Sequence, residues 1–324
     1  MVSTEFKQRG LAELIGERLE GEAEVSYSVA TRIHPTSENW NLRATYRSAY
    51  DNDAVILCVG NDEKIEAEGY DRIDLRLTPD QEEFIRNTAK ANKNVIVVVY
   101  AGGAIDMSAW IDDVKAVVYA GFLGEAANEA LASVLTGKVV PSGKLAETFP
   151  LSVEDTPTGT ETGNGFTEWY REGIFVGYRY YDSYHKAVLF PFGHGLSYAD
   201  FSYDDLQILK LSETDYEVSY NVTNNSDFSA KEISQVYVKD VFCMVLRPEK
   251  ELKGFSKDEI GPHETKRVTV RLDARSFAYY NVSLKRWHVE NGAFEILVGA
   301  SSQDIRLSAR IDIDLPEEEQ QTVC

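Results

Sequence analysis

The residue types that could carry chemistry gather in one short stretch of the sequence. It reads Glu63-Lys64-Ile65-Glu66-Ala67-Glu68-Gly69-Tyr70-Asp71-Arg72, so three carboxylic acids precede a flexible glycine, an aromatic ring and a fixed cation. A carboxylic acid can hand a proton to a departing oxygen atom when burial and neighbouring charges tune its pKa. The stretch therefore contains what a tuned proton donor requires.

The element before this stretch should place it where ligands bind. Residues 54–60 form a short apolar run that is typical of a buried strand in a parallel sheet. The glutamates then fall on the loop that leaves the carboxyl end of that strand, and open α/β sheets bind their ligands at this edge. Glutamates on loops are more often solvated surface charge, so the position alone leaves both interpretations open.

The same residues resemble a known family. The segment Glu68-Gly69-Tyr70-Asp71-Arg72 and the following residues 77–85 are similar to the acid/base loop and next helix of the glycoside hydrolase family 3 β-glucosidases. Further similar segments follow in order at residues 141–150, 173–182 and 190–198, and residues 247–255 resemble the fibronectin type III-like domain at the end of those enzymes. Ordered matches over most of the chain are more specific than any single motif.

The resemblance assigns roles within the glutamate loop. It makes Glu68 the acid/base residue of a retaining β-glucosidase, which hydrolyses terminal non-reducing β-D-glucosyl residues, with Glu66 and Glu63 as fallback candidates. Asp71 and Arg72 are expected to pair and to fix the loop beside Tyr70. Glu68 would need a closed, apolar site to act as a proton donor near neutral pH.

A retaining glycosidase needs a second carboxylate about 5–5.5 Å from the first. In the family this nucleophile is an aspartate in a Ser-Asp-Trp segment of a (β/α)₈ barrel, which usually precedes the part represented here. None of the four tryptophans, Trp40, Trp110, Trp169 and Trp287, belongs to such a segment, and the family's Lys-His sugar-binding pair is also missing. The nucleophile is therefore expected on a separate barrel-bearing chain or domain, and this chain alone should hydrolyse little.

Several alternatives stay open. The chain could be a fragment, a subunit or part of a permuted enzyme. It could also be a non-catalytic carbohydrate-binding or structural module that was retained after loss of the barrel. Substrate preference is open as well, and β-xylosides or β-galactosides remain candidates. Nucleotide binding is disfavoured because Gly102-Gly103 and Gly121-Phe122-Leu123-Gly124 lack the spacing of a dinucleotide fingerprint.

Alternating helix and strand signals predict the fold of the first half. Residues 1–150 are expected to form an α/β sandwich domain with a mostly parallel sheet, incomplete at its N-terminal end by comparison with the family. The expected elements are a helix over residues 4–19, a strand over 23–30, a helix over 39–50, a strand over 54–60, a helix capped by Thr78 with Pro79 first, strands over 94–100 and 116–120, and a helix over 124–137 that glycine ends.

The second half has a different pattern. Residues 151–198 form a connector rich in tyrosine, whose aromatic residues are expected to pack between domains rather than to stack on sugars. Residues 199–315 contain short alternating strands without helices between them, which indicates an all-β sandwich of the immunoglobulin or fibronectin III-like kind. Residues 316–324 are an acidic tail that we expect to be disordered.

The length and net charge of the chain limit the kinds of ligand and partner that it can bind. The 324 residues allow two domains, and 53 acidic against 33 basic residues give a net charge of −20. This charge argues against nucleic acid and anionic membranes and suits a neutral ligand such as a β-glucoside or oligosaccharide. No apolar run approaches the roughly 20 residues of a membrane helix. The N-terminus lacks a basic segment followed by an apolar one, so we expect no secretory signal and a cytoplasmic protein. Association into an oligomer stays open.

The sequence suggests no cofactor and no metal. Its three cysteines, Cys58, Cys243 and Cys324, are odd in number and widely spaced, which argues against a disulfide framework and against a tetrahedral zinc site. Cys58 is expected to be a small core residue. His194 stands between two glycines with no second ligand nearby in sequence, which favours a structural histidine over a catalytic or metal-binding one.

Overall fold

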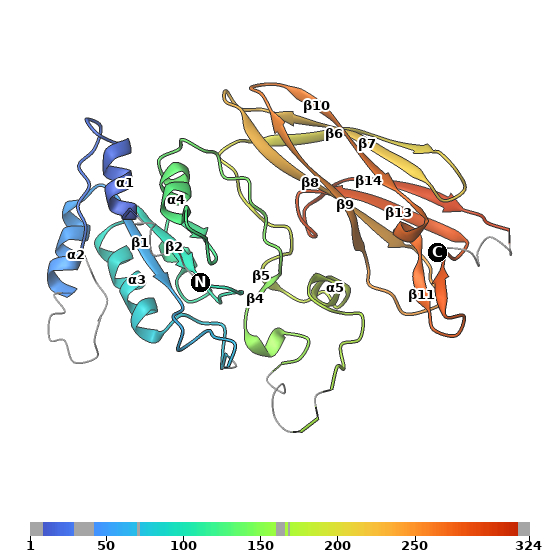
Figure 1. Cartoon of the computed structure of the whole chain (residues 1–324), viewed down its shortest axis with the longest axis horizontal. Helices are drawn as coiled ribbons and strands as arrows, with labels where there is room; N and C mark the ends of the chain where they lie inside the picture. Colours follow the sequence, from blue (N-terminus) through green and yellow to red (C-terminus); the bar gives the residue numbers. More distant parts are fainter. Residues whose placement is uncertain (1–8, 29–41, 70–71, 160–165, 168, 317–324) are drawn as a thin grey trace. The chain divides into compact units, whose positions relative to one another are not determined.

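The structure is a computed structural model of the chain, and it describes residues 9–28, 42–69, 72–159, 166–167 and 169–316 (Figure 1). The chain divides into two compact units. The first comprises residues 1–139 and 151–153, and the second comprises residues 140–150 and 154–324. Among the described residues, no helix is long and apolar enough to cross a membrane.

A three-stranded parallel sheet forms the centre of the first unit. Its strands follow the order β1 (Val55–Gly60), β2 (Val95–Tyr100) and β3 (Ala116–Tyr119). The middle strand is the most deeply buried, because it has neighbours on both sides. Its β-branched residues pack well on the pleated surface, and Val95, Val97, Val98 and Val99 are inaccessible to solvent. The parallel α/β architecture predicted for this half is confirmed.

Helices complete the unit. They are α1 (Leu11–Arg18), α2 (Leu42–Asp51), α3 (Pro79–Ala91) and α4 (Ala127–Leu135), with a 3₁₀ turn, η1 (Ile111–Asp113). Helix α3 contacts β2 and α2, and α1 packs against α4. Thr78 caps α3 as predicted, because its side chain accepts a hydrogen bond from the Gln81 N–H. The glycine stop of α4 is also present, since Gly137 follows the helix with a left-handed φ of 73°.

Two local predictions for this unit are wrong. Residues 23–28 form no strand, and residues 29–30 of that predicted strand lie outside the described residues. Cys58 is exposed instead of buried in the core. Side chains alternate along a strand, and β1 buries Leu57 and Val59 on one face only. The prediction took the apolar run for a strand that is covered on both faces, whereas only the face of Leu57 and Val59 is buried.

The second unit is an antiparallel β-sandwich, which confirms the all-β prediction. One sheet has the order β10-β7-β6 and the other has the order β14-β13-β8-β9. Strand β7 shows the expected alternation, with Tyr216, Val218, Tyr220 and Val222 buried and the residues between them partly exposed. The strands of the two sheets are β6 (Phe201–Lys210), β7 (Tyr216–Asn224), β8 (Ala230–Asp240), β9 (Glu251–Ile260), β10 (Thr265–Leu272), β13 (Gly292–Gly299) and β14 (Ile305–Ile313).

Several smaller elements do not belong to the two sheets of the sandwich. The strands β4 (Phe149–Pro150) and β5 (Val188–Phe190) pair with each other, and so do β11 (Tyr279–Asn281) and β12 (Arg286–His288). The short helices are α5 (Tyr178–Ser183) and α6 (Ala274–Phe277), and η2 spans Val153–Asp155. The predicted acidic tail lies outside the described residues from residue 317 onward.

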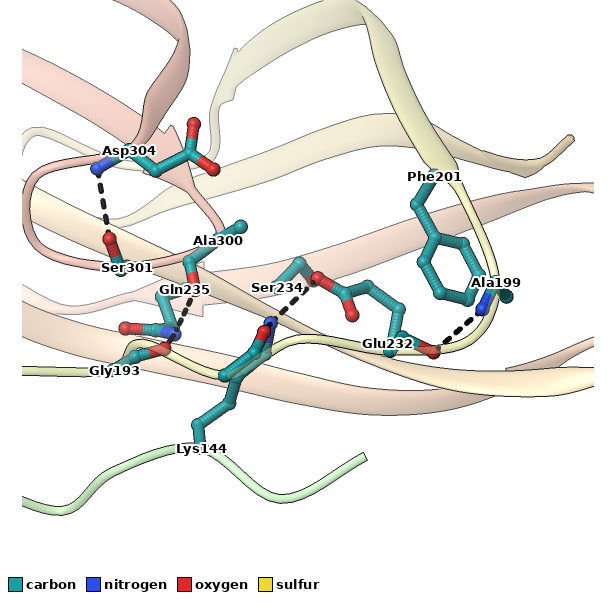
Figure 2. Close-up of polar contacts among 12 residues, drawn as sticks. Lys144, Gly193, Ala199, Phe201, Glu232, Ser234, Gln235, Ala300, Ser301 and Asp304 are labelled. Carbon is teal, nitrogen blue, oxygen red and sulfur yellow. Dashed lines mark hydrogen bonds and ion pairs between the residues drawn. The ribbon is translucent and has the colours of Figure 1, made fainter. Parts of the chain in front are cut away.

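Two of the family-like segments meet on this sandwich. Figure 2 shows Lys144, from the segment before β4, donating to Glu232 on β8 at 3.2 Å, and its ammonium also donates to the carbonyl of Gly195 at 3.2 Å. The hydroxyl of Tyr203 donates to the same Glu232 oxygen at 2.8 Å. Glu232 is almost fully buried, so these partners satisfy its charge where water cannot. The contacts give residues 141–150 and 190–198 a structural role.

The tyrosine-rich connector is buried only in part. Tyr178 stacks on Phe192 at a ring separation of 4.6 Å, and its hydroxyl accepts a hydrogen bond from the Leu252 N–H at 2.8 Å. Burial raises the pKa of this Tyr178 hydroxyl. In contrast, Trp169 and Tyr170 are exposed, at 67% and 82% of their surface. The connector thus both packs α5 onto the sandwich and presents aromatic side chains to solvent.

Candidate active site

The glutamate loop lies at the carboxyl edge of the parallel sheet, as its sequence position predicts. It begins directly after Gly60, the last residue of β1. The side chain of Gln81 in α3 holds Gly60 from both directions, because its amide accepts from the Gly60 N–H and donates to the Gly60 carbonyl, each at 2.9 Å. The next residue, Asn61, donates its backbone N–H to the carbonyl of Tyr100 at 2.9 Å. The start of the loop is therefore fixed to both α3 and β2.

Asp62 shapes the first turn of the loop. Its side chain accepts from the Lys64 N–H at 2.9 Å, and its carbonyl accepts from the N–H groups of Ile65 and Glu66 at 3.0 Å. Such a side-chain bond to the backbone two residues ahead defines an Asx turn. The turn brings Glu66 back toward Asn61, whose side-chain amide donates to Oε2 of Glu66 at 3.0 Å.

The three glutamates have different surroundings. Glu66 is half-buried, whereas Glu63 and Glu68 are exposed. Glu68 forms neither a hydrogen bond nor an ion pair with any residue that the structure describes. The closed apolar surroundings that a proton donor needs would have to come from outside the described residues of this unit.

The residues expected to support the loop are described only in part. Tyr70 and Asp71 lie outside the described residues, and with them the predicted Asp71–Arg72 pair. Arg72 donates from Nη1 to the carbonyl of Ala104 at 3.0 Å. Its Nε and Nη2 atoms are buried, and they have no hydrogen-bond partner among the described residues. Arg72 thus ties the loop to the segment after β2.

The end of the loop is anchored to α3. Arg76 donates from Nε to Glu82 at 3.0 Å and forms an ion pair with the same carboxylate, which is almost fully buried. This hydrogen bond with Glu82 raises the pKa of Arg76. The carbonyl of Leu75 accepts from the Asp106 N–H at 2.7 Å. Both ends of the glutamate loop are therefore fixed to neighbouring elements.

A feature that the sequence did not indicate lies after β2. The hydroxyl of Tyr119 donates to the carbonyls of Ala101, at 2.9 Å, and Gly103, at 3.3 Å. A Cβ atom at Gly102 would collide with Oε1 of Glu66 and would lie 2.9 Å from Cε2 of Phe122. The lack of a side chain at Gly102 thus lets Glu66 of the glutamate loop and the ring of Phe122 approach the backbone after β2. The pair itself was visible in the sequence, but only as a poor match to a dinucleotide motif.

No metal centre emerges from the described residues, because they contain no group of three or more His, Cys, Asp or Glu side chains that could hold an ion. His194 stacks on Phe190 with a ring separation of 4.8 Å. Burial lowers the pKa of His194, and the charge of Lys144 lowers it further. These surroundings agree with the structural histidine that was predicted.

Comparison with known proteins covers both units. Residues 6–198 match the model of the glycosyl hydrolase family 3 C-terminal domain, and residues 232–302 match that of the fibronectin type III-like domain. The chain is 45% identical over 272 residues to thermostable beta-glucosidase B of Acetivibrio thermocellus, a match that covers 83% of this chain and 36% of that protein. It is 41% identical over 268 residues to an exo-alpha-(1->6)-L-arabinopyranosidase of Bifidobacterium breve, covering 82% and 35%.

A solved structure agrees with these matches. The crystal structure of a GH3 beta-glucosidase from Bifidobacterium adolescentis has a TM-score of 0.88 and 37% identity, over 98% of this chain and 48% of that one. The chain spans about a third of the length of the two curated relatives. The family match covers more than half of the chain and includes the glutamate loop. The chain therefore belongs to glycosyl hydrolase family 3, and it carries the family's C-terminal domain together with a fibronectin type III-like domain.

Proposed function

We propose that this chain supplies Glu68 as the acid/base residue of a retaining β-glucosidase whose nucleophile lies on a (β/α)₈ barrel in a separate chain or domain. The observation that supports this most is the position of Glu68. It sits on a loop that is fixed at both ends at the carboxyl edge of a parallel sheet. That edge is where α/β sheets bind ligands.

The proposed reaction has two steps. In the first, Glu68 gives its proton to the glycosidic oxygen while the barrel carboxylate attacks the anomeric carbon from about 5–5.5 Å away. In the second, Glu68 accepts a proton from the water that releases the sugar from the glycosyl-enzyme. The barrel would close the site over Glu68 and provide the apolar surroundings that an acid of this kind needs. We also propose that the protein is cytoplasmic.

Glu68→Ala in the assembled enzyme tests the assignment. Turnover should fall strongly, whereas formation of the glycosyl-enzyme from an activated aryl glucoside should persist, because a good leaving group needs no proton. Added azide should restore turnover and yield β-glucosyl azide, since this anion attacks without a general base. Glu83→Ala, an exposed glutamate of helix α3 outside the loop, is the matched control and should behave as wild type. A normal rate for Glu68→Ala would refute the assignment, and the fallback candidates Glu66 and Glu63 would then be replaced in the same assay.

A non-catalytic carbohydrate-binding or structural module is the second candidate. The observation in its favour is the exposure of Trp169 and Tyr170, because sugars stack on aromatic rings that face solvent. This candidate predicts that the isolated chain binds oligosaccharides, which calorimetry can measure. Absence of binding by the chain alone, together with activity on mixing with a barrel-bearing chain, would exclude it.

A preference for β-glucosides is part of this proposal. The relatives named above are a beta-glucosidase and an arabinopyranosidase, so members with similar C-terminal parts act on different sugars. Activity of the assembled enzyme on a panel of aryl glycosides would assign the preference, with β-glucoside as the expected best substrate.

A further inference from the structure

Gly102 separates a carboxylate from an aromatic ring at the carboxyl edge of the sheet. Oε1 of Glu66 and the ring of Phe122 both approach the point where a Cβ atom of residue 102 would lie, and Cε2 and Cδ2 of the ring are 2.9 and 3.1 Å from that point. Any side chain at position 102 would therefore displace both groups. The arrangement depends on a glycine at the end of β2.

Both groups are available for contact. Phe122 is 62% exposed although it is a large apolar residue, and the neighbouring Leu123 is 44% exposed. Asn61 occupies Oε2 of Glu66, whereas Oε1 receives no hydrogen bond from any described residue. Gly121, with a left-handed φ of 65°, turns the chain immediately before Phe122. The carboxyl edge of the sheet thus presents the exposed ring of Phe122 beside Oε1 of Glu66, which no described residue occupies.

This pair of groups fits one class of ligand. A pyranose ring has an apolar C–H face and polar hydroxyl groups at its rim, so an aromatic ring and a carboxylate side by side can satisfy both. An aryl group would use the aromatic ring alone. The carboxylate makes the contact unsuited to anionic ligands such as phosphates.

We propose that Phe122 and Glu66 bind the leaving-group part of the glycoside, with the ring of Phe122 stacked on it and Oε1 of Glu66 accepting from a hydroxyl. This inference rests on the proposed function. Glu66 and Phe122 share the sheet edge with Glu68, whose proton goes to the leaving oxygen. They therefore lie on the side of the site where the leaving group departs, while the nucleophile on the barrel faces the sugar that is retained.

The ring contact is tested with two glucosides and the enzyme assembled from this chain and a barrel-bearing chain. In Phe122→Ala, kcat/KM for phenyl β-glucoside should fall about two- to tenfold, the effect of losing one ring contact, and kcat/KM for methyl β-glucoside should not change. Hydrolysis of the glycosyl-enzyme should also be unchanged, because the leaving group has already departed. Tyr50→Ala, another exposed aromatic residue of the same unit, is the matched control and should alter neither substrate.

The hydrogen bond is tested separately. Glu66→Gln keeps the shape of the side chain and an acceptor for Asn61. It should lower kcat/KM for a glucose disaccharide more than for phenyl β-glucoside, which has no hydroxyl on its leaving group. Equal losses on both substrates would assign Glu66 to loop structure and overturn its part in the contact.

The outcomes for Phe122 separate this inference from the proposed function. One outcome is that Glu68→Ala is inactive, as proposed, while Phe122→Ala has wild-type kcat/KM for both glucosides. This outcome would overturn the leaving-group contact alone. Equal losses on methyl and phenyl β-glucoside would overturn it as well. A wild-type assembly that hydrolyses neither glucoside would overturn the proposed function and this inference together.

Discussion

Lys250 and Asp182 form an ion pair of 3.1 Å in which both side chains are almost fully buried, at 9% and 3% exposure. Asp182 lies in the last turn of the connector helix α5 and Lys250 precedes β9, so the pair joins two segments that are far apart in the sequence. The second oxygen of Asp182 accepts from the side chain of Gln303 at 2.9 Å. The contact thus joins two of the family-like segments, because Asp182 belongs to residues 173–182 and Lys250 to residues 247–255.

Replacing Asp182 should destabilise the second unit strongly. Asp182→Asn leaves the ammonium of Lys250 buried without a counter-charge, which costs about 3–5 kcal/mol of unfolding free energy. Urea unfolding measures the loss. Glu213→Gln, which breaks an exposed pair with Lys210, is the control and should have no measurable effect.

A double variant checks the cause of that loss. Asp182→Leu with Lys250→Met removes both charges, so it should recover much of the stability that Asp182→Asn loses. If the double variant were as unstable as the single one, shape and hydrogen bonding would matter more than the unpaired charge.

Stability of the second unit should depend on pH through His194. Burial and the charge of Lys144 hold its pKa below the usual value, while the charge of Asp304 acts in the opposite direction. The unfolded chain therefore takes up this proton first as the pH falls. The stabilisation is complete above the unfolded pKa of about 6.5 and is lost as the pH falls from there toward the lower folded pKa.

The variant His194→Phe tests this dependence. A phenyl ring keeps the stacking on Phe190 but cannot titrate. The difference in unfolding free energy between pH 7 and pH 5 should be smaller in this variant than in wild type, with carboxylates contributing equally to both. Identical pH dependence in the two proteins would show that His194 takes no part.

The sequence predicted most of the elements because local signals specify them. The buried valines of β2 and the cap of Thr78 depend on residue types and spacing within one segment. The close approach of Glu66 and Phe122 to Gly102 could not be predicted, because these three residues come from three separate segments of the chain. The pairing of Asp182 with Lys250 is tertiary in the same way. The burial of Cys58 was misjudged because an apolar run does not reveal whether both faces of its strand are covered.

Substitution at the exposed Cys58 should therefore be mild. Cys58→Ser removes no buried apolar side chain and keeps a partner for the Tyr100 hydroxyl, so the unfolding free energy should change by less than about 1 kcal/mol. Its neighbour across the sheet, Val98, is completely buried. Val98→Ala should cost about 2 kcal/mol from the two methyl groups it removes. Equal effects of the two substitutions would mean that Cys58 is a core residue after all.

The start of the glutamate loop should tolerate no side chain at position 60. In Gly60→Ala the new Cβ atom would collide with the carbonyl of Tyr100 and would lie 2.9 Å from its Cβ atom. This carbonyl is held in place by the pairing of β1 with β2 and by its hydrogen bond from Asn61, so it cannot move away freely. The collision should cost about 1–3 kcal/mol of unfolding free energy, measured with urea. Gly124→Ala meets no atom within 4 Å and needs no unusual backbone angle, so it should be neutral or slightly stabilising. If Gly60→Ala were as stable as Gly124→Ala, the close approach to β2 would not constrain the loop.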